Sequence, residues 1–255
     1  MKTRDLIIAT AVIYDGDWEK MLDSFARKEH IPPETVFSIV SNLKCQTLTM
    51  LDDNYPSYLK EMHRPPFVLF YEGDISLIED PTKCLSVVGT RKPSEKGIKV
   101  TKEIVEQTCK KYITVSGLAS GIDRIAHKTT IESGGKTVAV LGSGIDYCFP
   151  NENRDIFKKI KKDHLLISEY PPGSQPKSEH FPFRNRLIAA FSKGILITES
   201  KIRSGTSITA SFGLLFGRDV MCLPSSEYNE SGCNKFIKEG ASLVENADDV
   251  LFIMQ

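Results

Sequence analysis

From residue 84 to the end of the chain, short apolar runs alternate with longer segments whose apolar residues recur at helical spacing. Apolar runs of four or five residues bounded by glycine are typical of buried parallel strands, and the segments between them are typical of the helices that connect such strands. The pattern therefore predicts an α/β fold with an extended Rossmann-like, doubly wound, mostly parallel sheet. The predicted strands are residues 85–89, 112–116, 137–141, 165–168, 194–198, 220–223 and 242–244.

The residues before position 84 follow a different pattern. Apolar residues at helical spacing between 6 and 25, and a further helical run after Pro32-Pro33, predict a small helical module. Prolines then surround a single strand-like run, Phe67–Tyr71, which is expected to join the main sheet. The predicted division is a helical module at 1–50, a connector at 51–83 and the Rossmann-like domain at 84–255.

The composition adds little to the predicted fold, but it argues against a strongly basic protein, a disulfide or zinc protein and a membrane protein. The 255 residues include 33 basic and 33 acidic side chains, so a nucleic-acid surface would have to be a local patch. Six scattered cysteines without a CxxC pair favour buried thiols in a reducing compartment over a disulfide framework or a zinc site. The sequence shows no secretory signal and no apolar run of membrane-spanning length, which predicts a cytoplasmic protein without membrane contact.

Turns rich in glycine and hydroxyl residues follow several of the predicted strands. Because the carboxyl ends of parallel strands meet at one edge of a sheet, the backbone N–H groups of these turns are expected to converge on one crevice that binds phosphate. Glycine also ends many strands without a ligand, and serine at a helix start is often only a cap. The candidate residues in these turns are Gly89, Thr90, Ser116, Gly117, Gly121, Gly142, Ser204, Gly205 and Thr206.

Arginines occur in two of the candidate segments. Arg91 follows the first predicted strand of the domain, where it can give a bidentate fork to a phosphate or form an ion pair with a neighbouring carboxylate. Arg184 and Arg186, with Asn185 between them, precede an apolar helical run over 187–191. Cations are unfavourable at a helix start, so this placement indicates an anionic ligand or a carboxylate partner.

Several other residues have an ambiguous or a structural interpretation. Phe181 either stacks on a base or belongs to the core beside its neighbouring prolines. The turn over 116–123 is not GxGxxG and the chain has no GxxxxGK[ST], which disfavours ordinary NAD and Walker-type nucleotide binding. The basic segment 158–162 is interpreted as a solvated helix face, and His127 and His164 as structural residues.

A set of segments stands in fixed order along the chain. This set closely resembles the DprA/Smf family of DNA-processing proteins over residues 51–251. The resemblance implies a protein that binds and protects single-stranded DNA and helps to load RecA in natural transformation, usually as a homodimer, without a catalytic step, cofactor or metal. The segments are NYPSYLKEMHRPPFVLFYEGD (54–74), SVVGTR (86–91), SGLASGIDRIAH (116–127), GGKTVAVLGSGID (134–146), FPFRNRLIA (181–189), SGTSITA (204–210) and SGCNKFIKEGASLV (231–244).

By matching positions, the resemblance also implies roles for single residues. Arg91 would grip a DNA phosphate, and Lys136 would add a second basic contact. Phe181, Arg184 and Arg186 would line the same groove.

The chain departs from the family pattern at two places. Family members commonly carry an arginine where this chain has Ser120, which removes one cation from the groove. Many members also have a C-terminal winged-helix module, whereas this sequence ends at Gln255, so the functions of that module are not carried over.

Two alternatives of other classes stay open from the sequence. One is a nucleoside-monophosphate phosphoribohydrolase, whose site also lies under a glycine-rich turn but carries a PGGxGTxxE-type motif. Here the turn at 204–210 has no acidic residue, although Glu199 is near it in the chain. The other is a sensor that binds a nucleotide in the same crevice without turnover.

Overall fold

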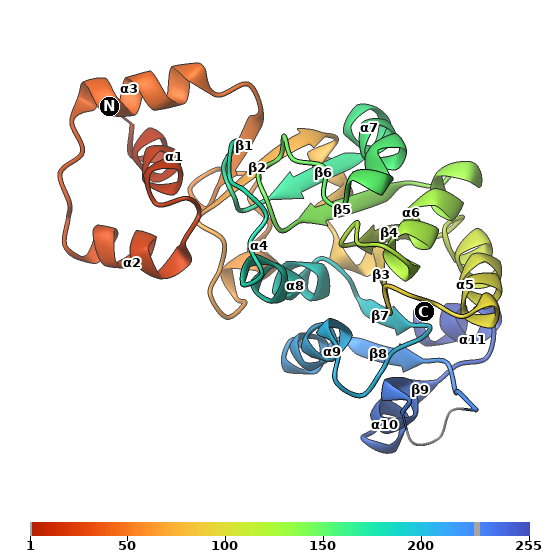
Figure 1. Cartoon of the computed structure of the whole chain (residues 1–255). Coiled ribbons are helices and arrows are strands. Elements are labelled where there is room, and N and C mark those ends of the chain that lie inside the picture. The colour runs from red at the N-terminus through yellow and green to blue at the C-terminus, as the bar shows by residue number, and fades with distance from the viewer. Residues whose placement is uncertain (1, 227–229) are drawn as a thin grey trace.

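A single sheet forms the centre of the molecule (Figure 1). The structure is a computed structural model that describes residues 2–226 and 230–255, and within these residues the sheet has nine strands. The strands are β1 (Gln46–Thr49), β2 (Val68–Gly73), β3 (Cys84–Val88), β4 (Ile113–Ser116), β5 (Thr137–Leu141), β6 (Leu165–Ser168), β7 (Gly194–Ile197), β8 (Asp219–Cys222) and β9 (Ser242–Leu243).

The strand order reverses at β3. The order across the sheet is β1-β2-β6-β5-β4-β3-β7-β8-β9, so the chain adds β4, β5 and β6 on one side of β3 and then returns to add β7, β8 and β9 on the other. The strands from β3 to β9 pair in parallel, and β2 pairs antiparallel with both β1 and β6. This order confirms the predicted doubly wound, Rossmann-like fold and creates a switch point between β3 and β7, where open α/β sheets bind ligands.

Helices cover both faces of the sheet (Figure 1). In the described part of the chain, none of them is long and apolar enough to cross a membrane. The helices are α1 (Thr3–Ile13), α2 (Trp18–Ala26), α3 (Pro33–Asn42), α4 (Ser57–Lys60), α5 (Glu95–Thr108), α6 (Ile122–Glu132), α7 (Arg154–Asp163), α8 (His180–Ala190), α9 (Gly205–Leu215), α10 (Gly232–Lys238) and α11 (Ala247–Ile253), with 3₁₀ turns at Ile75–Ile78, Pro81–Lys83 and Asn151–Asn153.

The central strands are buried on both sides, which explains why they read as continuous apolar runs. Val87 of β3 packs with Ile104 of α5 in the layer that also contains α6 and α11. Val88, the next residue, packs with Leu187 and Ile188 of α8 in the opposite layer. Both layers are therefore needed to cover the strands whose carboxyl ends form the site.

Strand β2 joins the sheet as the sequence predicted, but β1 lies in the segment that was expected to be helical. Strand β1 has four residues, and Leu48 is opposite Leu69 of β2. A strand of four residues is too short to show an alternation of apolar and polar residues, and its hydrogen bonds go to residues about twenty positions away along the chain. Helical neighbours therefore masked it in the sequence.

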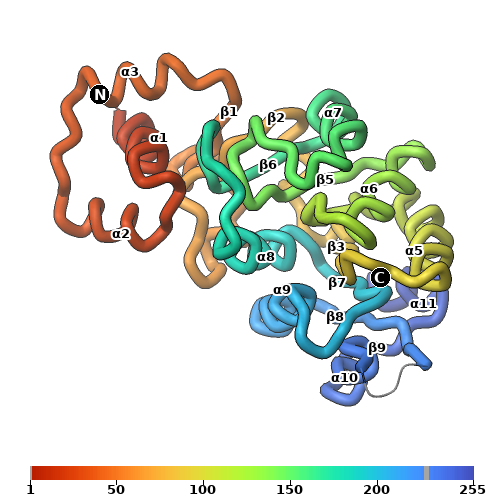
Figure 2. Tube along the Cα trace, in the orientation of Figure 1, coloured from red at the N-terminus to blue at the C-terminus, as the bar shows by residue number. Residues whose placement is uncertain are grey.

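The N-terminal helices are fixed to the outer strands of the sheet. Ile8 of α1 packs with Phe70 of β2. Trp18 of α2 stacks on Phe67 with ring centroids 5.2 Å apart, and its indole Nε1 donates a hydrogen bond of 2.8 Å to the carbonyl oxygen of Pro65. Figure 2 shows these helices at one end of the molecule, beyond β1.

His127 of α6 makes folding stability depend on pH. Its side chain is fully buried, and burial lowers its pKa from 6.5 to about 3. The unfolded chain binds this proton near pH 6.5, so the contribution of the neutral ring is complete above that pH and is lost as the pH falls toward 3. The loss is about 1.4 kcal/mol per pH unit.

We expect His127→Gln to remove this dependence, because glutamine does not titrate. Denaturant unfolding of both proteins at about pH 7 and about pH 5 should show the wild type losing roughly 2 kcal/mol more than the variant. An equal loss in the two proteins would contradict the assignment.

Candidate nucleic-acid interface

A groove of about 600 Å³ opens at the carboxyl edge of the sheet, beside the switch point between β3 and β7. It lies between the turn after β3, the start of α8 and the segment that leads from β7 into α9. The predicted site residues that line it are Gly89, Thr90, Arg91, Phe181, Arg184, Asn185, Ser204, Gly205 and Thr206.

A cation and two aromatic rings form a row in this groove. The guanidinium carbon of Arg91 lies 5.9 Å from the ring centroid of Phe181. The Phe181 ring lies 5.5 Å from that of Phe149, at an interplanar angle of 30°. Phe149 is 47% exposed and Arg91 is exposed, so both are accessible to a ligand. Aromatic faces beside a cation are the arrangement on which single-stranded nucleic acids stack.

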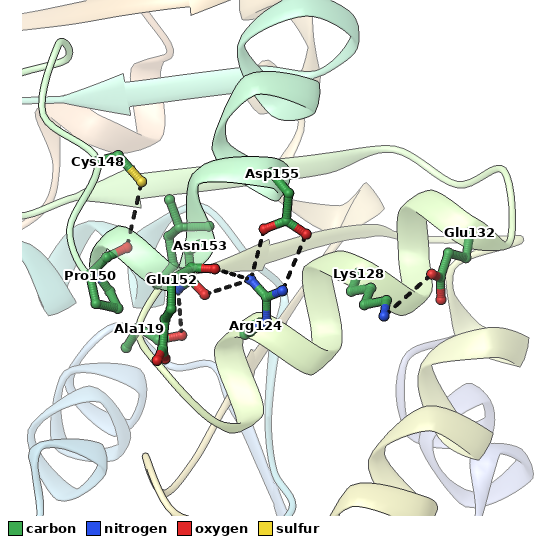
Figure 3. Close-up of polar contacts among 10 residues, drawn as sticks. Ala119, Arg124, Lys128, Glu132, Cys148, Pro150, Glu152, Asn153 and Asp155 are labelled. Carbon is green, nitrogen blue, oxygen red and sulfur yellow. Dashed lines mark hydrogen bonds and ion pairs between the residues drawn. The ribbon is translucent and has the colours of Figure 1, made fainter.

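The loop that carries Phe149 is tied to the start of α6 (Figure 3). Asn153 donates from its side-chain nitrogen to the carbonyl oxygen of Ala119 at 3.2 Å. Arg124 of α6 donates to the side-chain oxygen of Asn153 at 2.8 Å and forms an ion pair with Asp155 at 3.0 Å. The connection between β5 and α7 is thus anchored on the side of Phe149 that leads into α7.

Two glycines allow the groove to assemble. A Cβ on Gly142 would lie 2.7 Å from a ring carbon of Phe181, so only glycine lets this ring settle against the end of β5. Gly121 has a φ of +76°, and a Cβ there would lie 2.4 Å from the carbonyl oxygen of Thr90. The N–H of Thr90 in turn donates to the carbonyl oxygen of Glu199 at 2.8 Å. These contacts hold the turn after β3 between α6 and the end of β7.

The groove is cationic although the whole chain is electrically balanced. Its described lining includes four cations, and Asp123 is the one carboxylate among these residues. Arg91, Lys201 and Arg203 are exposed, whereas Arg184 is buried. The sequence analysis missed Lys201, Arg203 and Phe149. The two cations directly precede the candidate turn at 204–206 in the sequence, which was a usable signal.

Arg184 braces the floor of the groove. Its guanidinium donates to the carbonyl oxygens of Gly117, at 2.8 Å, and of Val140. Burial lowers the pKa of Arg184 to about 10, so the group stays charged at neutral pH. Burial raises the pKa of Asp123, against the opposing effects of Arg184 and of N–H groups of Ala119 and Gly117. Arg184 thus supplies positive potential from below, with part of its donors already used.

The start of α9 is open, whereas the start of α5 is not. Ser204 makes no side-chain cap on α9, and among the described atoms none lies within 4 Å of the position that a Cβ of Gly205 would take. At α5, both carboxylate oxygens of Glu199 accept from the N–H of Ser94, at 3.1 and 3.0 Å. The internal carboxylate takes the place where a dinucleotide phosphate binds in Rossmann folds. An outside anion therefore has α9 available and not α5.

Arg186 is in the core and has no free donor fork for a ligand. It is 1% exposed, forms a two-bond ion pair with Glu169, with one bond of 2.7 Å, and donates to the carbonyl oxygen of Arg64 at 2.9 Å. The predicted helix start was wrong, because α8 begins at His180 and not near residue 187. Arg186 is therefore inside the helix, on its buried side, and the predicted anionic partner is a protein carboxylate.

Two further candidates lie away from the groove. Lys136 precedes β5 and is therefore at the opposite edge of the sheet, where its ammonium group donates to the carbonyl oxygen of Asp163 at 3.0 Å. The hydroxyl of Ser116 is buried and donates to the carbonyl oxygen of Val87 at 2.6 Å. The structure thus separates Lys136 from the residues with which it was grouped, and it gives Ser116 a role inside the sheet.

Fold and groove together define a Rossmann-like α/β protein with an aromatic and cationic groove at the carboxyl edge of its sheet. Within residues 2–226 and 230–255, no three His, Cys, Asp or Glu side chains cluster closely enough to hold a metal ion. A family model described as DNA recombination-mediator protein A matches residues 46–255. The chain belongs to this family, which confirms the resemblance inferred from the sequence.

Relatives and solved structures agree with this assignment. DNA processing protein DprA of Streptococcus pneumoniae is 41% identical over 210 residues, covering 82% of this chain and 74% of that protein. The X-ray structure of S. pneumoniae DprA has a TM-score of 0.78 at 34% identity and covers 97% of this chain and 92% of that chain. A structure of DNA processing protein A from Helicobacter pylori, concerned with its single-stranded DNA binding mode, has a TM-score of 0.75 at 26% identity and covers 84% of this chain and 97% of that chain.

The buried pair of Arg186 and Glu169 yields a stability prediction. Arg186→Met leaves the Glu169 carboxylate buried without its partner, and we expect denaturant unfolding to show a loss of about 3 to 5 kcal/mol. Arg91→Met at the exposed position should stay within about 0.5 kcal/mol of the wild type. Adding Glu169→Met to Arg186→Met should recover much of the loss. Unchanged stability of Arg186→Met would show that the pair is not structural.

Proposed function

We propose that this chain binds single-stranded DNA in the groove at the carboxyl edge of its sheet. The observation that carries the proposal is the row formed by Arg91, Phe181 and Phe149. Bases stack on the two rings, while the phosphates meet Arg91 and the cations beside the start of α9. A duplex keeps its base faces covered, so the row favours a single strand. The single-stranded DNA binding mode of the H. pylori relative supports this proposal.

The proposed role is to protect incoming DNA and to promote RecA loading in natural transformation or recombination. RecA and a second copy of this chain are the proposed protein partners, in the cytoplasm. Membership in the DNA recombination-mediator family and similarity to the DprA proteins support this role.

We favour a binding protein without turnover over a phosphoribohydrolase. A hydrolase of that kind needs a carboxylate that can act on a ribose. Asp123 accepts from the N–H groups of Gly117 and Ala119, at 3.1 and 3.3 Å, and Glu199 is held by Ser94. Both carboxylates therefore already accept hydrogen bonds from neighbouring segments, Asp123 from the turn before α6 and Glu199 from the start of α5. An assay for adenine release from AMP separates the two functions.

Two substitutions in the groove test the proposal, with a matched control at the opposite edge of the sheet. Phe181→Ala should lower the affinity for an unstructured single-stranded oligonucleotide by about 1 to 3 kcal/mol, because it removes a stacking face. Arg91→Ala should reduce the slope of log affinity against log salt by about 0.7, which is the effect of one lost phosphate contact. Lys136→Ala should change neither quantity. Fluorescence anisotropy over a salt series measures all three.

Unchanged binding by Arg91→Ala at low salt would show that the DNA lies elsewhere. Equal weakening by Lys136→Ala and Arg91→Ala would mean that a diffuse basic surface, and not this groove, binds the strand. The matching duplex should bind more weakly than the single strand throughout.

A further inference from the structure

A second pocket, of about 270 Å³, lies on the other side of the turn after β3. Thr90 and Lys201 line both this pocket and the groove, so the two cavities meet at these residues. The backbone of Lys201 forms a β-bridge with Ser231, and a Cβ on Gly232 would lie 2.6 Å from the carbonyl oxygen of Lys201. The rim between the two cavities is therefore held in place by close backbone contacts.

The chemistry of the second pocket differs from that of the groove. Hydroxyl residues such as Ser94, Ser200 and Ser231 line it, and Glu199 is the one carboxylate among its described lining residues. No aromatic side chain belongs to this described lining. The volume is below the range of roughly 300 to 1,000 Å³ that is usual for ligand pockets, so it suits one base better than a nucleotide cofactor.

The carboxylate of Glu199 is fixed in this pocket. Its Oε2 accepts from the hydroxyl of Ser94 at 2.8 Å and from the N–H of Ser94 at 3.0 Å. A Cβ on Gly97 would lie 2.0 Å from Oε2, so this oxygen is pressed against the start of α5. Oε1 shares the N–H of Ser94 at 3.1 Å. Since a carboxylate has about four acceptor positions, Oε1 retains capacity for a donor that enters the pocket.

We propose that a bound single strand passes Thr90 and Lys201 and places one unstacked base in the second pocket, where Glu199 accepts a hydrogen bond from an exocyclic amino group. Cytosine carries this amino group at position 4 and adenine at position 6. Thymine and uracil present a carbonyl oxygen at position 4, which a carboxylate repels. Lys201 meets the phosphate that crosses the rim. The inference rests on the proposed function, because the strand reaches the second pocket from the groove.

The sharpest test compares oligo-dC with oligo-dU of equal length, because the two bases differ at the amino or carbonyl group of position 4 and at N3, and neither carries the methyl group of thymine. We expect the wild type to bind oligo-dC about tenfold more tightly than oligo-dU at neutral pH, because one hydrogen bond to a charged acceptor contributes roughly that difference in affinity. Glu199→Gln replaces one acceptor oxygen with an amide donor. It should remove or reverse the preference and leave oligo-dU binding at least as tight as in the wild type.

Glu95→Gln is the matched control. It also removes one carboxylate charge near the start of α5, but Glu95 lies in the first turn of that helix and is not among the lining residues of the pocket. This variant should keep the preference for oligo-dC. A thermal unfolding scan of each variant shows whether α5 has stayed in place.

The possible outcomes are distinct. Equal affinity of the wild type for the two oligonucleotides overturns the inference and leaves the proposed function standing. A preference that survives in Glu199→Gln, with both oligonucleotides weakened equally, also overturns it and assigns Glu199 a structural role only. Absence of binding to both oligonucleotides by the wild type contradicts the proposed function itself, and the inference with it.

Discussion

The hydrogen bonds between Ser94 and the Glu199 carboxylate decide how the carboxyl edge of this sheet is used. They join the start of α5 to the end of β7 across the switch point. The Glu199 carboxylate thus lies at the helix terminus where the phosphates of a dinucleotide bind in other Rossmann folds. Asp123 likewise accepts hydrogen bonds from the turn after β4. The positive potential that is left over lies at α9 and on the exposed cations around it. A long, flexible polyanion can follow such a distribution, whereas a compact cofactor finds its usual place filled.

The arginines of the site show how burial separates recognition from architecture. Arg91 is exposed and lies over an aromatic ring, Arg184 is buried with its donors partly used by carbonyl oxygens, and Arg186 is closed in an ion pair. In the sequence these three arginines have the same charge and the same hydrogen-bond donors. Their different roles come from the position of each side chain on its element and from the partner that the fold supplies.

The fold was predictable because strands buried on both faces leave continuous apolar runs, whereas the meeting of Arg91 with Phe181 was expected only from the resemblance to the family. The burial of Arg186 was not predictable, since Glu169 belongs to a different segment and the start of α8 was misplaced. Lys136 was assigned from its motif alone. Its place before β5, and not after it, contained the information that it lies at the opposite edge.

The balanced charge of the chain has a consequence for how the groove meets its ligand. With 33 charges of each sign, the molecule has no net monopole to attract a polyanion from a distance, but a cationic groove on a neutral body gives it a local electric dipole. Such a field extends little beyond the screening length of about 8 Å at physiological ionic strength. The pull of the groove is therefore felt only by a polyanion that already lies close to the groove. The approach of a polyanion is thus guided over the last few ångströms by the local charge of the groove and not from a distance by the charge of the whole molecule.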